Sequence, residues 1–254
     1  MIQLDELNTD RIRHAFYSRR GGVSQGIYRS LNCGFGSGDQ RKSVAANRAR
    51  TMAALDCEPE ILVTCNQIHS NIVHIIDSDE RPSEPPRADG LVTMRKNVAL
   101  GVLTADCAPV LFSDPADGII GACHAGWRGA LNGIIEATVD AMIELGARPD
   151  NIQAAVGPCI GRESYEVGPE FPQPFLEQDR NNAEFFSPGE REGHFQFDLS
   201  NYCASRLSRL KLAEIYRLDS DTCRDGPNFF SYRRSRLREE PDYGRQLSTI
   251  VIAE

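Results

Sequence analysis

The sequence predicts an α+β fold, with a single domain over residues 1–254, mixed and antiparallel sheets, and flanking helices. Three observations lead to this prediction. Short apolar runs bounded by turn residues recur along the chain and are typical of strands. Two longer stretches have apolar residues at helical spacing. The length of 254 residues allows one large core or two tightly joined halves.

The first third of the chain predicts one helix and two strands. Apolar residues recur at helical spacing over residues 42–55, and Ser43 can cap this helix. Residues 61–65 and 72–76 are short apolar runs that predict strands. We expect loops at three polar stretches rich in breaking residues, namely 34–39, 79–89 and 178–193.

The middle of the chain predicts strands joined as hairpins. Residues 98–104 and 109–112 are apolar and strand-like. A turn with Pro and Asp-Gly at 114–118 leads into a returning strand at 119–123. This arrangement favours antiparallel pairing.

A long helix follows the hairpin. Residues 127–145 predict one amphipathic helix, which Gly146 ends. Residues 152–156 predict the next strand. Neither standard type of glycine-rich phosphate loop occurs, so a nucleotide cofactor is not indicated.

Composition excludes two classes of partner. The formal net charge is -8 and the sequence pI is near 5.2, which argues against a nucleic-acid partner bound through its phosphates. No stretch is long and apolar enough to span a bilayer, so we expect no membrane partner. The opening residues MIQLDELNTD lack the pattern of a secretory signal, and we expect a cytoplasmic location.

The sequence contains eight cysteines at irregular spacings, without a CxxC motif. In a cytoplasmic protein these thiols stay reduced, and most should be small core residues. One or two of them are candidates for metal ligands or nucleophiles.

Three short segments combine chemically active residues with strand ends: NQIHS at 66–70, TADCAP at 104–109 and HAGWRG at 124–129. They contain His69, Cys107 and His124. Two imidazoles and one thiolate are a standard ligand set for catalytic zinc, with a fourth position left for water. Zinc lowers the pKa of that water to about 7, which supplies hydroxide at neutral pH.

Strand alternation separates ligands from core residues. Cys123 and His124 are adjacent, so they face opposite sides of an extended strand, and we expect Cys123 in the core. His69 and His74 differ by an odd number of residues, and we expect His74 to be structural. The three ligand candidates match no local zinc motif, and each alone is more often an ordinary core or surface residue. From the residues alone, two interpretations stand: a metal site, or three ordinary core or surface residues.

Five motifs together identify a family. NQIHS, TADCAPVLF, HAGWRG, GPCIG and FFSYRR resemble the YfiH-like, laccase-domain family, whose members are described as polyphenol oxidases or as purine nucleoside phosphorylases. The opening segment RGGVSQG at 20–26 also resembles this family. The resemblance runs from about residue 14 to the C-terminus. The segment SRLREEPDYGR departs from it, since a shorter connection is usual there.

The resemblance implies a cytoplasmic enzyme with zinc held by His69, Cys107 and His124, which are also its catalytic residues. It implies phosphorolysis of adenosine, inosine and methylthioadenosine, and deamination of adenosine. The expected partners are therefore purine nucleosides and phosphate. Copper is the alternative ion at the same site.

Three residues are candidates for binding substrate. Arg128 is the leading candidate for phosphate, because it stands at the start of a helix whose free N–H groups also favour anions. Arg48 is the second candidate, or else lies on a solvated helix face. Gln67 could bind the base or ribose, or cap a strand end. We expect Trp127 to pack against other side chains and not to stack on the substrate.

The proton carrier has two candidates. Asp106 and Asp89 could act as general acid and base, or could merely anchor turns. Cys107 has a rival role as a covalent nucleophile, since a thiolate beside imidazole is also typical of cysteine hydrolases.

Three other functions compete with this reading. The first is a cytoplasmic hydrolase that edits cell-wall precursors through the same zinc or thiol. The second is a copper-dependent polyphenol oxidase. The chain has only five histidines, and a blue-copper centre together with a trinuclear cluster needs more imidazoles than that. The third is a structural zinc module, which normally has four protein ligands where this sequence offers three.

Overall fold

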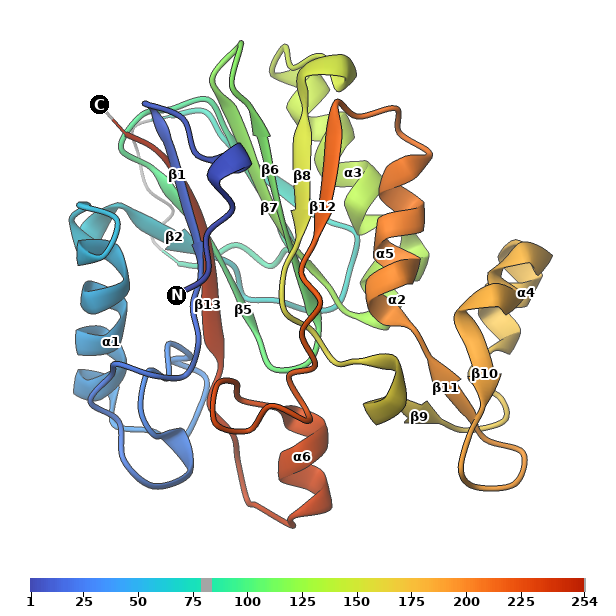
Figure 1. Cartoon of the computed structure of the whole chain (residues 1–254). Helices are drawn as coiled ribbons and strands as arrows, with labels where there is room; N and C mark the ends of the chain where they lie inside the picture. The colour runs from blue at the N-terminus through green and yellow to red at the C-terminus, as the bar shows by residue number, and fades with distance from the viewer. Residues whose placement is uncertain (79–83, 254) are drawn as a thin grey trace.

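The computed structural model describes residues 1–78 and 84–253. Two β-sheets pack face to face, and helices cover the outer face of each (Figure 1). This arrangement confirms the predicted α+β class with mixed and antiparallel sheets. Within the described part of the chain, no helix has the length and apolar character needed to cross a membrane.

The larger sheet has six strands and contributes two of the three site segments. Its central strands pair antiparallel, whereas each edge strand is parallel to its neighbour. In order across the sheet the strands are β12 (Glu214–Arg217), β8 (Gln153–Val156), β6 (Ala108–Asp114), β7 (Ile119–Ala125), β4 (Gly90–Thr93) and β3 (Val73–Ile76).

The smaller sheet joins the two ends of the chain. Its order is β1 (Ile12–Phe16), β13 (Gln246–Ile252), β5 (Ala99–Thr104) and β2 (Leu62–Thr64). The strand β13 pairs antiparallel with both β1 and β5, and β2 runs parallel to β5.

A third, short sheet projects from the body together with one helix (Figure 1). Its strands are β10 (Phe186–Pro188), β11 (Phe195–Phe197) and β9 (Glu166–Val167), and the helix is α4 (Gln173–Gln178). Aromatic rings, including Phe171 and Phe175 stacked at 5.6 Å, fill the space between α4 and the strands.

The remaining helices cover the sheets or border the site. The helix α1 (Arg41–Ala53) lies on the smaller sheet, while α3 (Ile134–Glu144) and α5 (Leu199–Ser208) lie on the larger one. Two six-residue helices, α2 (Trp127–Asn132) and α6 (Tyr232–Leu237), border the site. Short 3₁₀ turns occur at Asp5–Leu7, Gly26–Tyr28, Pro59–Ile61, Pro149–Asn151, Arg162–Ser164 and Arg180–Phe185.

Alternation along the central strands builds two cores. In β7, Ile120 and Ala122 face the smaller sheet, where they pack with Leu100. Their neighbours Ile119 and Cys123 face the helices. Burial of each large apolar side chain contributes about 1.5–3 kcal/mol, so both faces of this sheet hold the fold together.

The prediction of one continuous helix over 127–145 is wrong, because the helix breaks at Gly133. Gly133 has φ 90°, a left-handed conformation that glycine adopts without steric cost, and it separates α2 from α3. The prediction of Ser43 as a helix cap is also wrong. The cap position is Gln40, and the Ser43 N–H donates to the Gln40 carbonyl inside the first turn.

The predicted loops have mixed outcomes. Residues 34–39 form turns without a helix or strand, as expected. The stretch 178–193 contains a 3₁₀ helix and the strand β10, so the prediction of a loop is wrong there. Residues 84–89 are irregular, as expected, whereas 79–83 lie outside the described residues.

Gly157 provides a test of the packing between the sheets. A Cβ atom at this position would lie 2.2 Å from Cε1 of the buried Phe16 and 2.9 Å from Cγ of Pro109. We expect Gly157→Ala to lower the free energy of unfolding by about 1–3 kcal/mol, measured by urea titration. In the control Gly36→Ala, the added methyl meets nothing within 4 Å, and stability should change by less than about 0.5 kcal/mol. Equal stabilities of the two variants would contradict this packing.

Candidate metal centre and its cavity

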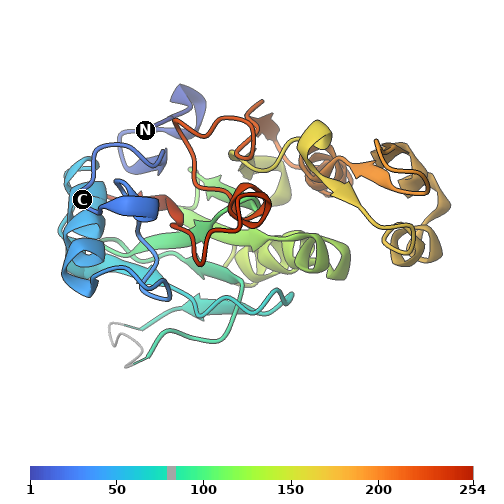
Figure 2. The same cartoon turned by 90° about the horizontal axis from the view of Figure 1, so that it is seen from below.

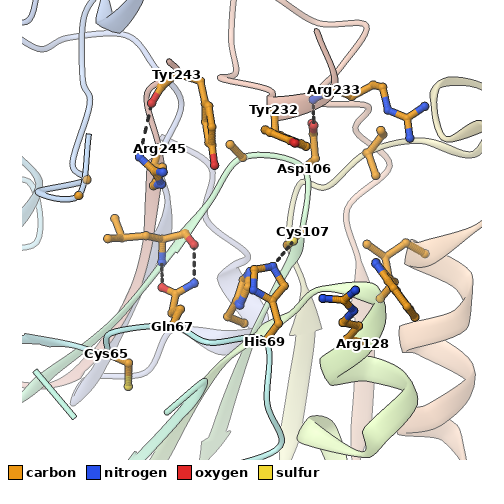
Figure 3. Close-up of a pocket in the computed structure, with 18 of the residues that line it drawn as sticks. Cys65, Gln67, His69, Asp106, Cys107, Arg128, Tyr232, Arg233, Tyr243 and Arg245 are labelled. Carbon is orange, nitrogen blue, oxygen red and sulfur yellow. Dashed lines mark hydrogen bonds between the residues drawn. The ribbon is translucent and has the colours of Figure 1, made fainter. Parts of the chain in front are cut away.

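Three side chains from distant segments meet at one end of the sheets. Their ligand atoms, from His69, Cys107 and His124, all lie within 4.8 Å of one another. The Cys107 Sγ is 3.9 Å from the His69 Nε2 (Figure 3). The imidazole rings of His69 and His124 are 4.8 Å apart at 80°. Within residues 1–78 and 84–253 this is the only group of three or more such side chains. The structure thus brings together the three residues that the sequence singled out.

A buried carboxylate holds both histidines in place. Asp89 is fully buried, and its Oδ1 lies 2.9 Å from the His124 Nδ1. The same carboxylate accepts hydrogen bonds from the backbone N–H groups of Ile68, His69 and Ser70. Burial raises the pKa of Asp89, but the hydrogen bonds from His124 and Ser70 outweigh burial and lower it to about 2.

These contacts explain the backbone at His69. This residue has φ 59°, in the left-handed region that residues other than glycine seldom adopt. The three N–H groups bound to Asp89 fix the turn in that conformation. Because residues 68–70 form a turn and not a strand, the alternation argument between His69 and His74 does not apply here. His74 itself lies in β3.

Cys107 is held by a second buried carboxylate. Asp106 has φ 91°, and its oxygens accept hydrogen bonds from the Thr222 and Ser231 hydroxyls and the Arg233 N–H. These contacts make Asp106 the anchor of its turn, one of its two predicted roles. Asp89 is engaged in the same way, so both carboxylates act on the protein itself.

The thiol and one imidazole influence each other electrostatically. Burial raises the pKa of Cys107, but the charge of His124 and hydrogen bonds from both imidazoles lower it to about 6. Burial lowers the pKa of His124, whereas the charge of Cys107 and the hydrogen bond to Asp89 raise it to about 9. The favoured state at neutral pH is therefore a thiolate, which is the form of cysteine that binds metals.

The HAGWRG segment is shaped around these ligands. Cys123 is buried on the helix side of β7, and His124 points to the opposite face, which confirms the prediction from alternation. A Cβ at Gly126 would lie 2.9 Å from the His69 Cδ2 and 3.0 Å from the Cys107 Sγ. The absence of a side chain at Gly126 therefore leaves room for both ligands.

A cavity of about 730 Å³ opens above the three ligands. Figure 2 views the molecule from this end, where α6 lies across the ends of the sheets. The walls of the cavity come from the turn at 34–36, the loops after β2 and β5, the start of α2, and the segment 232–245. Charged residues in the lining are Asp106, Arg128, Arg233 and Arg245 (Figure 3).

Of the predicted substrate residues, Gln67 and Arg128 line this cavity. The Gln67 amide donates to the Leu103 carbonyl and accepts from the Leu103 N–H, both at 2.8 Å, so it caps the end of β5. Arg128 is exposed, and its guanidinium lies 4.9 Å from the Trp127 ring. Trp127 packs against Phe171, as expected.

Arg48 lies behind the wall of the cavity. Its Nε donates to the Cys33 carbonyl at 2.8 Å, and its guanidinium stacks on Phe35 at 4.5 Å. Arg48 therefore supports the turn whose Gly34 and Gly36 line the cavity. A direct role in binding phosphate stays a prediction for Arg48, as base or ribose recognition does for Gln67.

Sequence reasoning missed four residues of the opposite wall: Tyr232, Arg233, Tyr243 and Arg245. Two of them lie inside FFSYRR, a motif that carried the resemblance without an assigned role. The other two lie in SRLREEPDYGR, the segment that departs from the family pattern. No spacing in the sequence links this segment to the candidate metal ligands.

Comparisons with known proteins found a matching family model and several relatives. The family model described as multi-copper polyphenol oxidoreductase laccase matches residues 13–253. A Rickettsia prowazekii protein named purine nucleoside phosphorylase is 39% identical over 191 residues, which cover 75% of this chain and 78% of that protein. A Corynebacterium glutamicum protein of the same name is 37% identical over 260 aligned residues, which cover 99% and 98%.

Two solved structures share the fold. The crystal structure of a Neisseria meningitidis protein superposes with a TM-score of 0.86 at 33% identity, covering 97% of this chain and 96% of that one. A Bacillus licheniformis protein named YfiH superposes with a TM-score of 0.88 at 28% identity, covering 95% and 92%. The chain therefore belongs to the YfiH-like laccase-domain family, whose model is described as multi-copper polyphenol oxidoreductase laccase.

Proposed function

We propose that this protein is a zinc-dependent purine nucleoside phosphorylase that acts on adenosine, inosine and methylthioadenosine and also deaminates adenosine. The observation that carries the proposal is the meeting of a His–Cys–His cluster with a large cationic cavity. The names of the related proteins support the reaction class. The substrates and the deaminase activity rest on the family resemblance.

The donor set fits a catalytic zinc ion. His69, Cys107 and His124 offer two nitrogen atoms and one thiolate, and Asp89 engages the Nδ1 of His124. An outer carboxylate of this kind fixes the ring and raises the basicity of the ligand. Copper accepts the same donors and is the alternative ion. When bound, zinc would supply a Lewis acid and would lower the pKa of a coordinated water to about 7.

The cavity suits small, partly anionic ligands. Its volume of about 730 Å³ lies within the usual range for small-molecule sites. Arginine side chains in its wall can bind the oxygens of phosphate through paired hydrogen bonds. Arg128 extends from the start of α2 beside the candidate metal ligands and is one of the arginines available for anion binding.

A second candidate function has its own supporting observation. Cys107, His124 and Asp89 follow one another as thiolate, imidazole and carboxylate, an order that also activates cysteine nucleophiles. This arrangement supports a cysteine-dependent hydrolase as the alternative, and cell-wall precursors as its substrate stay a prediction. In that case Cys107 would attack the substrate directly and would not bind metal at that moment.

The positions of the other histidines disfavour a multicopper oxidase. His14 lies in β1 and bonds to Asn8, His74 lies in β3, and His194 is in an exposed turn. They belong to separate parts of the structure, whereas a trinuclear copper cluster needs many imidazoles converging on one point.

Product analysis tests the proposed function. Zinc-loaded protein is incubated with adenosine, with and without phosphate, and the products are separated by chromatography. We expect adenine and ribose 1-phosphate only when phosphate is present, together with some inosine. If no nucleoside is converted while bound zinc is verified, the proposal fails and the hydrolase becomes the better hypothesis.

Removal of the thiolate should abolish metal binding. We expect Cys107→Ala to retain less than about a hundredth of the activity and to lose zinc, measured by elemental analysis after dialysis. The matched control is Cys123→Ala, sixteen positions along the chain and buried on the helix side of β7. It should keep its zinc and lose only about 1–2 kcal/mol of stability. Full activity in a zinc-free Cys107→Ala protein would refute the metal mechanism.

Gly126 tests the fit of the ligand cluster. The Cβ of Gly126→Ala would press on His69 and Cys107, so we expect zinc affinity to fall by roughly 10- to 100-fold. Affinity is measured by competition with a chromogenic chelator. Gly36→Ala also adds a methyl to the cavity wall but meets nothing, and it should bind zinc as the wild type does. Unchanged zinc affinity in Gly126→Ala would argue against coordination by these two side chains.

A further inference from the structure

The cavity concentrates positive charge in an acidic protein. The chain carries a formal charge of -8, yet three arginines line the cavity: Arg128, Arg233 and Arg245. Asp106 is the only carboxylate in the described lining, and both of its oxygens accept hydrogen bonds from the protein. A cleft whose charged side chains are mostly of one sign raises the local concentration of ligands with the opposite sign.

The arginines differ in how far the protein already uses their N–H groups. Arg233 donates to the Glu166 carbonyl at 2.7 Å. Arg234, its neighbour outside the cavity lining, donates to three carbonyls and is a structural cation. Among the described residues, the Arg245 guanidinium has only one hydrogen-bond acceptor, the Tyr243 carbonyl at 3.5 Å. Arg245 therefore has more free donors than Arg234, and its one acceptor is more distant than that of Arg233. The Arg128 guanidinium donates to no acceptor among the described residues, so position and burial, and not the number of free donors, distinguish Arg245 from Arg128.

Arg245 is nevertheless firmly positioned. Its backbone N–H donates to the Oδ1 of the fully buried Asn32, and its carbonyl accepts from the Cys33 N–H. Its stem packs on Gly34, where a Cβ would come within 2.9 Å of the Arg245 Cδ. The guanidinium stacks on the Tyr243 ring at 4.4 Å, which fixes its plane. A fixed arginine with unused donors is the arrangement expected of a ligand-binding residue.

Arg245 and Arg128 occupy different parts of the cavity. Figure 3 shows Arg245 beside Tyr243 and Gln67, and Arg128 on the other side of His69. Arg245 is half-buried, whereas Arg128 is exposed, and charge interactions are stronger away from water. The helix α2 has only six residues, so its N-terminus adds little to anion binding at Arg128.

We propose that Arg245 is the principal binding residue for the phosphate co-substrate, with Tyr243 orienting its guanidinium. The planar fork suits two phosphate oxygens at once. A third oxygen forms the bond to C1′ of the ribose as the C1′–N9 bond breaks. The bond electrons leave with the purine, which takes the proton of hydrogen phosphate, so that base and ribose 1-phosphate result. The identity of the anion as co-substrate rests on the proposed function.

The test replaces the guanidinium and keeps the stem. Arg245→Gln retains the carbons that pack on Gly34, and Arg245→Lys retains the charge without the fork. The control is Arg236→Ala, an exposed arginine of α6 outside the cavity lining. Binding of inorganic phosphate to each zinc-loaded protein is measured by isothermal titration calorimetry, and circular dichroism verifies folding.

The expected result is a loss of phosphate affinity of roughly 10- to 100-fold in Arg245→Gln, since a hydrogen-bonded charge is removed. Arg245→Lys should fall between this variant and the wild type, and Arg236→Ala should match the wild type. In phosphorolysis assays, the KM for phosphate should rise more than the KM for adenosine. Unchanged phosphate affinity in Arg245→Gln, or a rise confined to the KM for adenosine, overturns the inference.

The two proposals can fail separately. Phosphate binding that depends on Arg245 in a protein that converts no nucleoside would uphold the anion site and remove the proposed function. Phosphate-dependent turnover with the same phosphate affinity in Arg245→Gln would uphold the function and remove Arg245 from it.

Discussion

The candidate site depends on one buried carboxylate. Asp89 fixes the His124 ring by its Nδ1 and gathers the N–H groups of the turn that carries His69. A charged acceptor in a buried position makes strong hydrogen bonds, and breaking them costs a large free energy because the buried charge is left unpaired. One group thus orients two ligands from segments 55 residues apart, before any substrate arrives.

A second buried carboxylate anchors the turn of Cys107 and the cavity wall formed by α6. Asp106 connects the turn before Cys107 to Ser231 and the first residues of α6, so the ligand and the cavity wall share one anchor. Both Asp106 and His69 have positive φ values, which other residues must maintain. At these two positions, hydrogen bonds to buried carboxylates therefore hold the strained backbone in place.

Local patterns predicted the parts of this protein that local interactions determine. Alternation in β7 separated Cys123 from His124, and the turn residues at 114–118 located the β6–β7 hairpin. The break at Gly133 escaped prediction, because a single glycine within an apolar period is compatible with a continuous helix. Arg245 escaped for a different reason: the pairing of β13 with β5 and the hydrogen bonds of Arg245 with Asn32 and Cys33 bring it beside segments more than a hundred residues away.

The position of β13 between β1 and β5 also determines when the site can form during synthesis. All three candidate metal ligands leave the ribosome in the first half of the chain, but the wall with Tyr243 and Arg245 leaves it about 120 residues later. Until then β1 and β5 have no strand between them, and such long-range pairing forms slowly. Nascent chains can therefore place both histidines around Asp89 early, while the turn of Cys107 and the binding cavity wait for the segments that contain Thr222, Ser231 and β13.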